Sequence, residues 1–149
     1  MRGTKDGLRQ GTKLEFGRIL KKDLFLYLLD LEVKRARRYQ NFLCLLLLKF
    51  QRCSDHNGCD SQTCFKTLSD LLKVEMRESD ILGSLGGNKL VVLLPYADRS
   101  AGSNAKSRFE GTLKYYDFKS KGYKVMINQI CFPINGTDTM DLIKKALGT

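Results

Sequence analysis

The chain lacks a long apolar run, a recognisable secretory signal, an internal repeat and any low-complexity tract. Its longest apolar run, Phe42 to Leu48, is too short to cross a bilayer and is typical of a buried strand. The first residues, Met1 to Leu8, are polar and contain glycine, unlike a signal peptide. With 149 residues and 42% apolar content, the sequence predicts one globular domain with a single core, not a disordered chain.

Acidic residues are scarce relative to basic ones. The chain has 26 Lys and Arg against 16 Asp and Glu, which gives a formal net charge of +10. Such a surface favours anionic partners such as nucleotides, nucleic acid or phospholipid headgroups. The densest basic stretch, residues 34–38, suits a solvated helix end, where cations complement the negative end of the helix dipole. Aromatic residues are not interleaved with the basic ones as stacking platforms require, so we do not expect nucleic-acid binding.

Histidine is almost absent, and the cysteines are odd in number. An odd count without a signal peptide predicts reduced, cytosolic thiols. One cluster of four side chains offers an alternative, because Cys and His ligands can hold tetrahedral zinc: Cys53, His56, Cys59 and Cys64. Their spacing matches no common zinc finger, and Cys64 falls at an apolar position of a predicted helix. Ordinary thiols are therefore the expectation.

Hydrophobic periodicity predicts alternating helices and strands. The expected elements are a helix at 18–39, a strand at 41–50, a helix at 62–76, strands at 79–85 and 89–94, a helix at 100–115, a strand at 125–132 and a helix at 137–147. The first helix is expected to bury a stripe formed by Leu20, Leu24, Leu28 and Leu31, widened by Phe25 and Leu29. Thr137 or Asp138 is the expected N-cap of the last helix. The order predicts an α+β fold with a ferredoxin-like βαββαβ core and flanking helices.

Residues 77–90 carry the most informative motif. Arg77 and Asp80 form Arg-x-x-Asp, residues 81–85 follow, and Gly86-Gly87 makes a hairpin turn that needs positive φ. This stretch resembles the signature hairpin of GGDEF domains, the family that makes the bacterial second messenger cyclic di-GMP. The resemblance extends from about residue 17 to about residue 146 and implies the GGDEF, nucleotide-cyclase-like fold. We expect residues 17–149 to form this domain and residues 1–16 to be a tail or linker.

The resemblance also implies that the catalytic acids are missing. Lys49 and Gln51 stand where the family has acidic residues at the end of the first core strand, and Asn88 and Lys89 replace the acids of the hairpin turn. Magnesium needs hard oxygen ligands, chiefly carboxylates. An ammonium close to a cation is instead repelled by about 4 kcal/mol at intermediate dielectric. These lysines could bind nucleotide phosphates without a metal, but drift at exposed positions of an unused site is the simpler interpretation. We therefore expect a degenerate domain that is not an enzyme and needs neither magnesium nor another cofactor.

A ligand site is expected to remain. In the family, the product-binding site outside the active centre uses the Arg and Asp of Arg-x-x-Asp and a second arginine on the following helix. Counting from the glycine turn without gaps places that arginine at Arg108. The resemblance therefore implies that Arg77, Asp80 and Arg108 bind cyclic di-GMP. The plainer alternative for Arg77 and Asp80 is a surface ion pair worth about 0–1 kcal/mol.

The expected function is thus a cyclic di-GMP receptor in bacterial signal transduction, such as the control of biofilms. Besides cyclic di-GMP, the expected partner is another protein or a linked domain, and a homodimer stays open. The expected location is the cytoplasm, and attachment to a membrane would need a separate segment of a larger protein. The alternatives are a nucleotide-independent interaction or dimerisation domain, an active cyclase and a nucleic-acid binder.

Overall fold

A computed structural model describes residues 19–53 and 60–148 of the chain. The predicted tail at 1–16 therefore lies outside the described residues. In chain order the elements are helix α2 (Lys22–Tyr39), strand β1 (Leu43–Arg52), helix α3 (Ser61–Glu75), strands β2 (Ile81–Gly86) and β3 (Lys89–Pro95), helix α4 (Arg99–Tyr116), the short 3-10 helix η1 (Phe118–Lys121), strand β4 (Tyr123–Phe132) and helix α5 (Thr139–Ala146).

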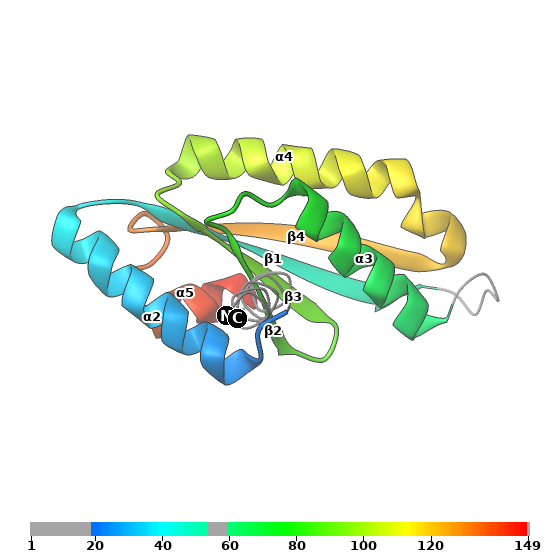
Figure 1. Ribbon diagram of the computed structural model, residues 1–149, viewed down its shortest axis with the longest axis horizontal. Helices are drawn as coiled ribbons and strands as arrows, with labels where there is room; N and C mark the ends of the chain where they lie inside the picture. Colours follow the sequence, from blue (N-terminus) through cyan, green and yellow to red (C-terminus); the bar gives the residue numbers. More distant parts are fainter. Residues whose placement is uncertain (1–18, 54–59, 149) are drawn as a thin grey trace, which may run out of the picture.

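A four-stranded sheet in the order β2-β3-β1-β4 forms the centre of the fold, and its neighbouring strands are antiparallel. Helices α3 and α4 cover one face, and α2 and α5 cover the other (Figure 1). Central strand β1 contributes side chains to both layers, since residues 43–48 are all buried. This explains the continuous apolar run in the sequence. The predicted α+β fold with a ferredoxin-like strand order is confirmed.

The first helix departs from the prediction. Leu20 lies before the helix and pairs with the β2 edge: its N–H donates to the Leu82 carbonyl, and its carbonyl accepts from Ser84 N–H, both at 2.9 Å. Leu24 and Leu31 are 49% and 40% exposed. Phe25 and Leu29 are buried as predicted, and Val33 and Ala36 complete the buried side of α2. The prediction was therefore wrong for Leu24 and Leu31, because α2 carries leucines on several sides and their period alone does not fix the buried one.

Asp side chains cap the N-termini of three of the α-helices. Asp60, Asp98 and Asp138 accept hydrogen bonds from the backbone N–H groups of Thr63, Ala101 and Asp141 at 2.7, 2.8 and 2.8 Å. These side chains satisfy N–H groups that have no partner within the first turn. For α5, the structure selects Asp138 from the two predicted caps.

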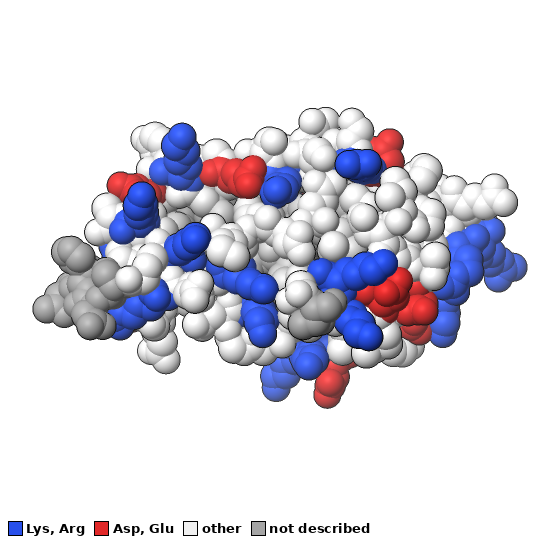
Figure 2. Space-filling model, turned by 180° about the vertical axis from the view of Figure 1, so that it is seen from behind, with Lys and Arg blue, Asp and Glu red and all other residues white. Residues whose placement is uncertain are grey.

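Basic side chains dominate the charged surface on the face that Figure 1 hides (Figure 2). This distribution agrees with the formal net charge of +10. Within residues 19–53 and 60–148, no helix has the length and apolar character to cross a membrane.

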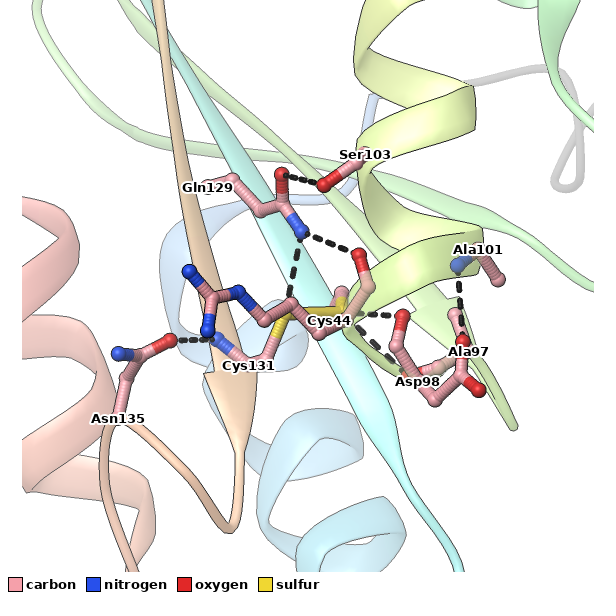
Figure 3. The surroundings of a disulfide bond; sticks show 9 residues. Cys44, Ala97, Asp98, Ala101, Ser103, Gln129, Cys131 and Asn135 are labelled. Carbon is pink, nitrogen blue, oxygen red and sulfur yellow. Dashed lines mark hydrogen bonds between the residues drawn. A yellow bond between two sulfur atoms is a disulfide. The ribbon is translucent and has the colours of Figure 1, made fainter.

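A disulfide joins Cys44 of β1 to Cys131 of β4 (Figure 3). The two residues lie opposite each other in the β1–β4 register, with Cα atoms 4.2 Å apart. The expectation of reduced thiols was therefore wrong for this pair. The sulfur of Cys131 accepts a hydrogen bond from Gln129 Nε2 at 3.3 Å. Gly102 of α4 packs here too, because a Cβ at that residue would lie 2.6 Å from the Cys44 sulfur.

Candidate functional site

The Arg77–Asp80 turn connects the end of α3 to the start of β2. Asp80 Oδ2 accepts a hydrogen bond from the backbone N–H of Arg77 at 2.8 Å, and the Arg77 carbonyl accepts one from Asp80 N–H at 3.0 Å. The two bonds close a tight turn that fixes the direction of the carboxylate. The Arg77 guanidinium takes no part in them, and it forms no ion pair with another residue of the described ranges. The turn is therefore not the surface ion pair considered as an alternative.

Arg108 reaches the same region from the middle of α4. Its Nε lies 3.8 Å from Oε1 of Glu75, a residue in the last turn of α3. The Arg108 side chain is 38% exposed and the Glu75 side chain 26% exposed, so the contact sits at the surface between the two helices. Arg108 therefore lies beside the α3 end from which the Arg77–Asp80 turn begins.

Asp80 is one of only two buried polar residues among those described, with 8% of its surface exposed. Burial raises the pKa of its carboxyl group above the ordinary value of 3.8. The hydrogen bond from Arg77 N–H and the positive charges of Arg77 and Arg108 act in the opposite direction, in that order. Because the charges of both arginines lower the pKa of this carboxyl group, Arg77, Asp80 and Arg108 lie in one neighbourhood. Their role in binding a ligand stays a prediction.

The predicted degenerate positions gather at the other end of the hairpin strands. Lys49 of β1 lies opposite Lys89 of β3 in the antiparallel register, and Gln51 lies two residues further along β1. Gln51, Asn88 and Lys89 are exposed, and the Asn88 carbonyl accepts a hydrogen bond from Phe50 N–H at 2.9 Å. The turn between them keeps positive φ at Gly86 (95°) and Gly87 (56°), as predicted. The backbone of the hairpin is thus regular, and the exposed side chains beside its turn are those of Asn88 and Lys89.

Lys49 has a partner that the sequence does not reveal. Its Nζ donates to the carbonyl of Leu147, directly after α5, at 3.3 Å. Nearby, Asn128 Nδ2 lies 3.4 Å from the Lys145 carbonyl and 3.2 Å from the Ala146 carbonyl. These side chains bind carbonyl groups at the C-terminus of α5, of which the Lys145 carbonyl also accepts from Gly148 N–H at 3.1 Å, and positive charge is favourable at such a helix end. Lys49 is therefore half-buried and holds the end of α5 against β1. The interpretation of Lys49 as an exposed residue without a structural role was wrong.

Neither group of residues fits a metal. Ammonium and carboxamide groups at Lys49, Gln51, Asn88 and Lys89 do not supply the carboxylate oxygens that magnesium requires. In the parts of the chain that the structure describes, no cluster of His, Cys, Asp and Glu could hold a metal ion. For the zinc alternative, Cys53 is exposed and Cys64 is buried in the core, whereas His56 and Cys59 lie outside the described residues.

The sequence profile of the family described as "Diguanylate cyclase, GGDEF domain" matches residues 17–146. The chain therefore belongs to the GGDEF family. No curated protein sequence matches it significantly.

Solved structures agree with this assignment. A diguanylate cyclase protein from Thermotoga maritima has a TM-score of 0.75 and 16% identity, over 90% of this chain and 97% of its own. Pseudomonas aeruginosa diguanylate cyclase SiaD, solved with its activator SiaC, has a TM-score of 0.74 and 17% identity, over 99% of this chain and 62% of its own. A microbial GGDEF domain solved for its interaction with bis-(3,5)-cyclic di-GMP has a TM-score of 0.65 and 13% identity, over 89% of this chain and 86% of its own. At these identities the likeness establishes the fold.

Proposed function

We propose that this chain is a catalytically inactive GGDEF domain that binds cyclic di-GMP through Arg77, Asp80 and Arg108. The observation that carries the proposal is the Asp80 carboxylate, which is buried, held by the Arg77 N–H and influenced by both arginines. A carboxylate fixed in this way is preorganised, so little conformational entropy is lost when a ligand binds. Signal transmission would then pass to a partner protein or a linked domain through a shift in population.

The chemistry of the three groups suits guanine. The N7 and O6 atoms of guanine are adjacent acceptors that fit the fork of an arginine such as Arg77. Its N1–H and N2–H₂ groups are adjacent donors that fit a carboxylate, and only one Asp80 oxygen is engaged by the described residues. Arg108 can stack on the purine or bind a phosphate, once its loose contact with Glu75 at 3.8 Å opens.

The proposal of inactivity rests on the other end of the hairpin. Lys49, which stands at a position where the family has an acid, is bound to the carbonyl that follows α5. Lys89 lies across from it, so two positive charges occupy adjacent positions on neighbouring strands. A divalent metal would meet repulsion there instead of ligands. We accordingly propose that the domain works without magnesium, and that it acts in the cytoplasm.

Isothermal titration calorimetry with cyclic di-GMP tests the binding proposal. We expect a Kd in the micromolar range or tighter for the wild type, and loss of binding for Arg77→Ala. Lys66→Ala is a matched control, because Lys66 is an exposed cation on α3 whose ion-pair partner among the described residues is Asp70 on its own helix. Wild-type affinity no stronger than for a cyclic dinucleotide without guanine would reject the receptor function. It would favour the nucleotide-independent interaction domain.

Incubation with GTP and magnesium tests the proposed inactivity. We expect no cyclic di-GMP in the product mixture under conditions in which an active diguanylate cyclase makes it. Formation of product that persists in Lys49→Ala would show that the family's chemistry survives without the acids, and would contradict the proposal.

A further inference from the structure

The two edges of the sheet differ in how they are covered. At the β2 edge, Leu20 makes two backbone hydrogen bonds and so protects the strand. At the other edge, the ten-residue strand β4 (Tyr123–Phe132) has β1 as its only neighbouring strand within residues 19–53 and 60–148. An uncovered edge strand presents unpaired N–H and C=O groups that can bind another extended chain.

The phase of the β4 hydrogen bonds identifies the groups that face outward. A Cα separation of 4.2 Å marks Cys44 and Cys131 as a pair without mutual hydrogen bonds, so the N–H of Cys131 points away from β1. In agreement, that N–H donates to Asn135 Oδ1 at 2.9 Å. By alternation, Val125, Ile127 and Gln129 also direct their backbone groups outward. Within the described residues these backbone groups have no hydrogen-bond partner.

A groove of about 550 Å³ runs beside this edge, between β4 and the second half of α4. Its apolar lining comes from Val125 and Ile127 of β4, with Leu113 and Phe118 opposite. The outward backbone groups and the apolar lining belong to the same residues of β4. The side chains of an added strand that pairs with Val125 and Ile127 would therefore fall into the groove.

The charge of the groove selects the kind of strand. Lys114, Lys119 and Lys124 line it, and none of them pairs with an acidic side chain in the described part of the chain. Two acidic residues also line the groove, and both carboxylates are engaged: Glu110 pairs with Lys106 at 3.9 Å, and Asp117 Oδ1 accepts a hydrogen bond from Ser120 N–H at 3.4 Å. A second copy of this protein, which has a net charge of +10, would bring the same lysines to the same edge. Like charges would then meet, which disfavours a second copy as the occupant. An acidic segment is complementary to them.

We propose that the outer edge of β4 binds an extended, acidic segment of a partner protein, which adds to the sheet as one more antiparallel strand. Main-chain hydrogen bonds to Val125, Ile127 and Gln129 would supply the pairing, and the groove would take alternate apolar side chains. The acidic side chains on the other face of the added strand would meet Lys124. This interaction is independent of the proposed cyclic di-GMP site.

Fluorescence anisotropy with a synthetic peptide of alternating Glu and Val tests the proposal. In the predicted pairing, the valines fall into the groove and their N–H groups point at β4. N-methylation of the valines should therefore abolish binding, whereas N-methylation of the glutamates should preserve it. These two peptides have the same composition and leave the protein unchanged. Equal binding of both methylated peptides, or no binding of the unmodified one, would overturn the proposal.

Two variants of the protein sharpen the test. Ile127→Pro removes one outward N–H without touching the β1–β4 hydrogen bonds, a change that edge strands tolerate, and should weaken binding about tenfold. Lys124→Glu should weaken binding by a similar factor, whereas Lys22→Glu, an exposed lysine on α2, should not. Circular dichroism establishes that each variant folds.

A wild-type dimer that Ile127→Pro converts to a monomer would assign the edge to a second copy and overturn the proposal. Binding that is lost with Arg77, Asp80 and Arg108 substituted together would do the same, because it would tie the edge to the nucleotide site.

Discussion

The Arg77–Asp80 turn and the Lys49–Lys89 strand pair lie at opposite ends of the β2–β3 hairpin and differ in the chemistry of their side chains. In the first, a carboxylate and two arginines stay in one neighbourhood, and the carboxylate is fixed by a backbone N–H at 2.8 Å. In the second, the backbone is equally regular, with the register between β1 and β3 continuing to Lys49 and Lys89. The difference lies in the side chains, which are a carboxylate and two guanidinium groups in the first region and ammonium and amide groups in the second.

The comparison shows that one regular backbone can carry two groups of side chains with different chemistry. At the Lys49–Lys89 end, Lys49 binds the Leu147 carbonyl at 3.3 Å. That contact joins the first core strand to the segment after α5 and so contributes to packing. At the other end, a buried acid keeps its place although burial alone disfavours its charge. The three predictions below test whether the two regions differ as described.

The largest effect is expected from Asp80→Ala. The substitution leaves the Arg77 N–H without its acceptor and should lower the free energy of unfolding by about 1–3 kcal/mol, besides removing cyclic di-GMP binding. Asp80→Asn keeps an acceptor oxygen and should cost less. Urea denaturation measures both, with Asp70→Ala as a control, because in the part of the chain that the structure describes Asp70 makes only an exposed ion pair with Lys66, at 3.1 Å. Equal stability of the Asp80→Ala and Asp70→Ala variants would contradict the anchoring role.

A smaller effect is expected from Lys49→Asp. It removes the donor to the Leu147 carbonyl and places a negative charge at the negative end of α5, which should lower stability by about 1–2 kcal/mol. The paired control is Lys89→Asp, which leaves that contact intact and relieves a like-charge neighbour, so stability should hold or rise slightly. Thermal denaturation compares the stability of the two variants with that of the wild type. If Lys89→Asp destabilised more than Lys49→Asp, the assigned role of Lys49 would be wrong.

The smallest effect concerns pH and the stability of the folded protein. Because burial raises the pKa of Asp80, the folded protein binds this proton more strongly than the unfolded chain does. Its contribution to stability therefore grows as pH falls through the raised pKa toward 3.8, and shrinks as pH rises. Affinity for cyclic di-GMP should change in the opposite direction, since guanine needs the ionised carboxylate as acceptor.

Urea denaturation across this acidic range should compare the free energy of unfolding of the wild type with that of Asp80→Asn. As pH falls, the wild type should gain stability relative to Asp80→Asn. Identical pH profiles of stability for the two proteins would show that the Asp80 carboxyl group titrates normally.

Much of the fold could be predicted from the sequence. Strand β1 was predicted because a continuous apolar run fits a strand buried on both faces, and Gly86-Gly87 located the hairpin by its need for positive φ. Arg108 was placed by its spacing from that turn within the family pattern. These features are local or depend on fixed spacing, so the sequence carries them directly.

The errors have a common physical origin. The buried side of α2, the partner of Lys49 and the Cys44–Cys131 bond all depend on which elements meet in three dimensions. The two cysteines are separated by 87 residues, and only the register of β1 against β4 places them face to face. Asn128 of β4, which binds carbonyls at the end of α5, was missed for the same reason. No pattern of neighbouring residues signals such contacts.

The bond between Cys44 and Cys131 has a consequence for the integrity of the protein. Both regions of the hairpin, together with Arg108, fall within the part of the chain that this bond closes into a covalent ring. A protease that cuts the ring once would leave a nicked molecule whose pieces stay attached. Such a molecule would migrate as one band on a gel until a reducing agent separates the fragments.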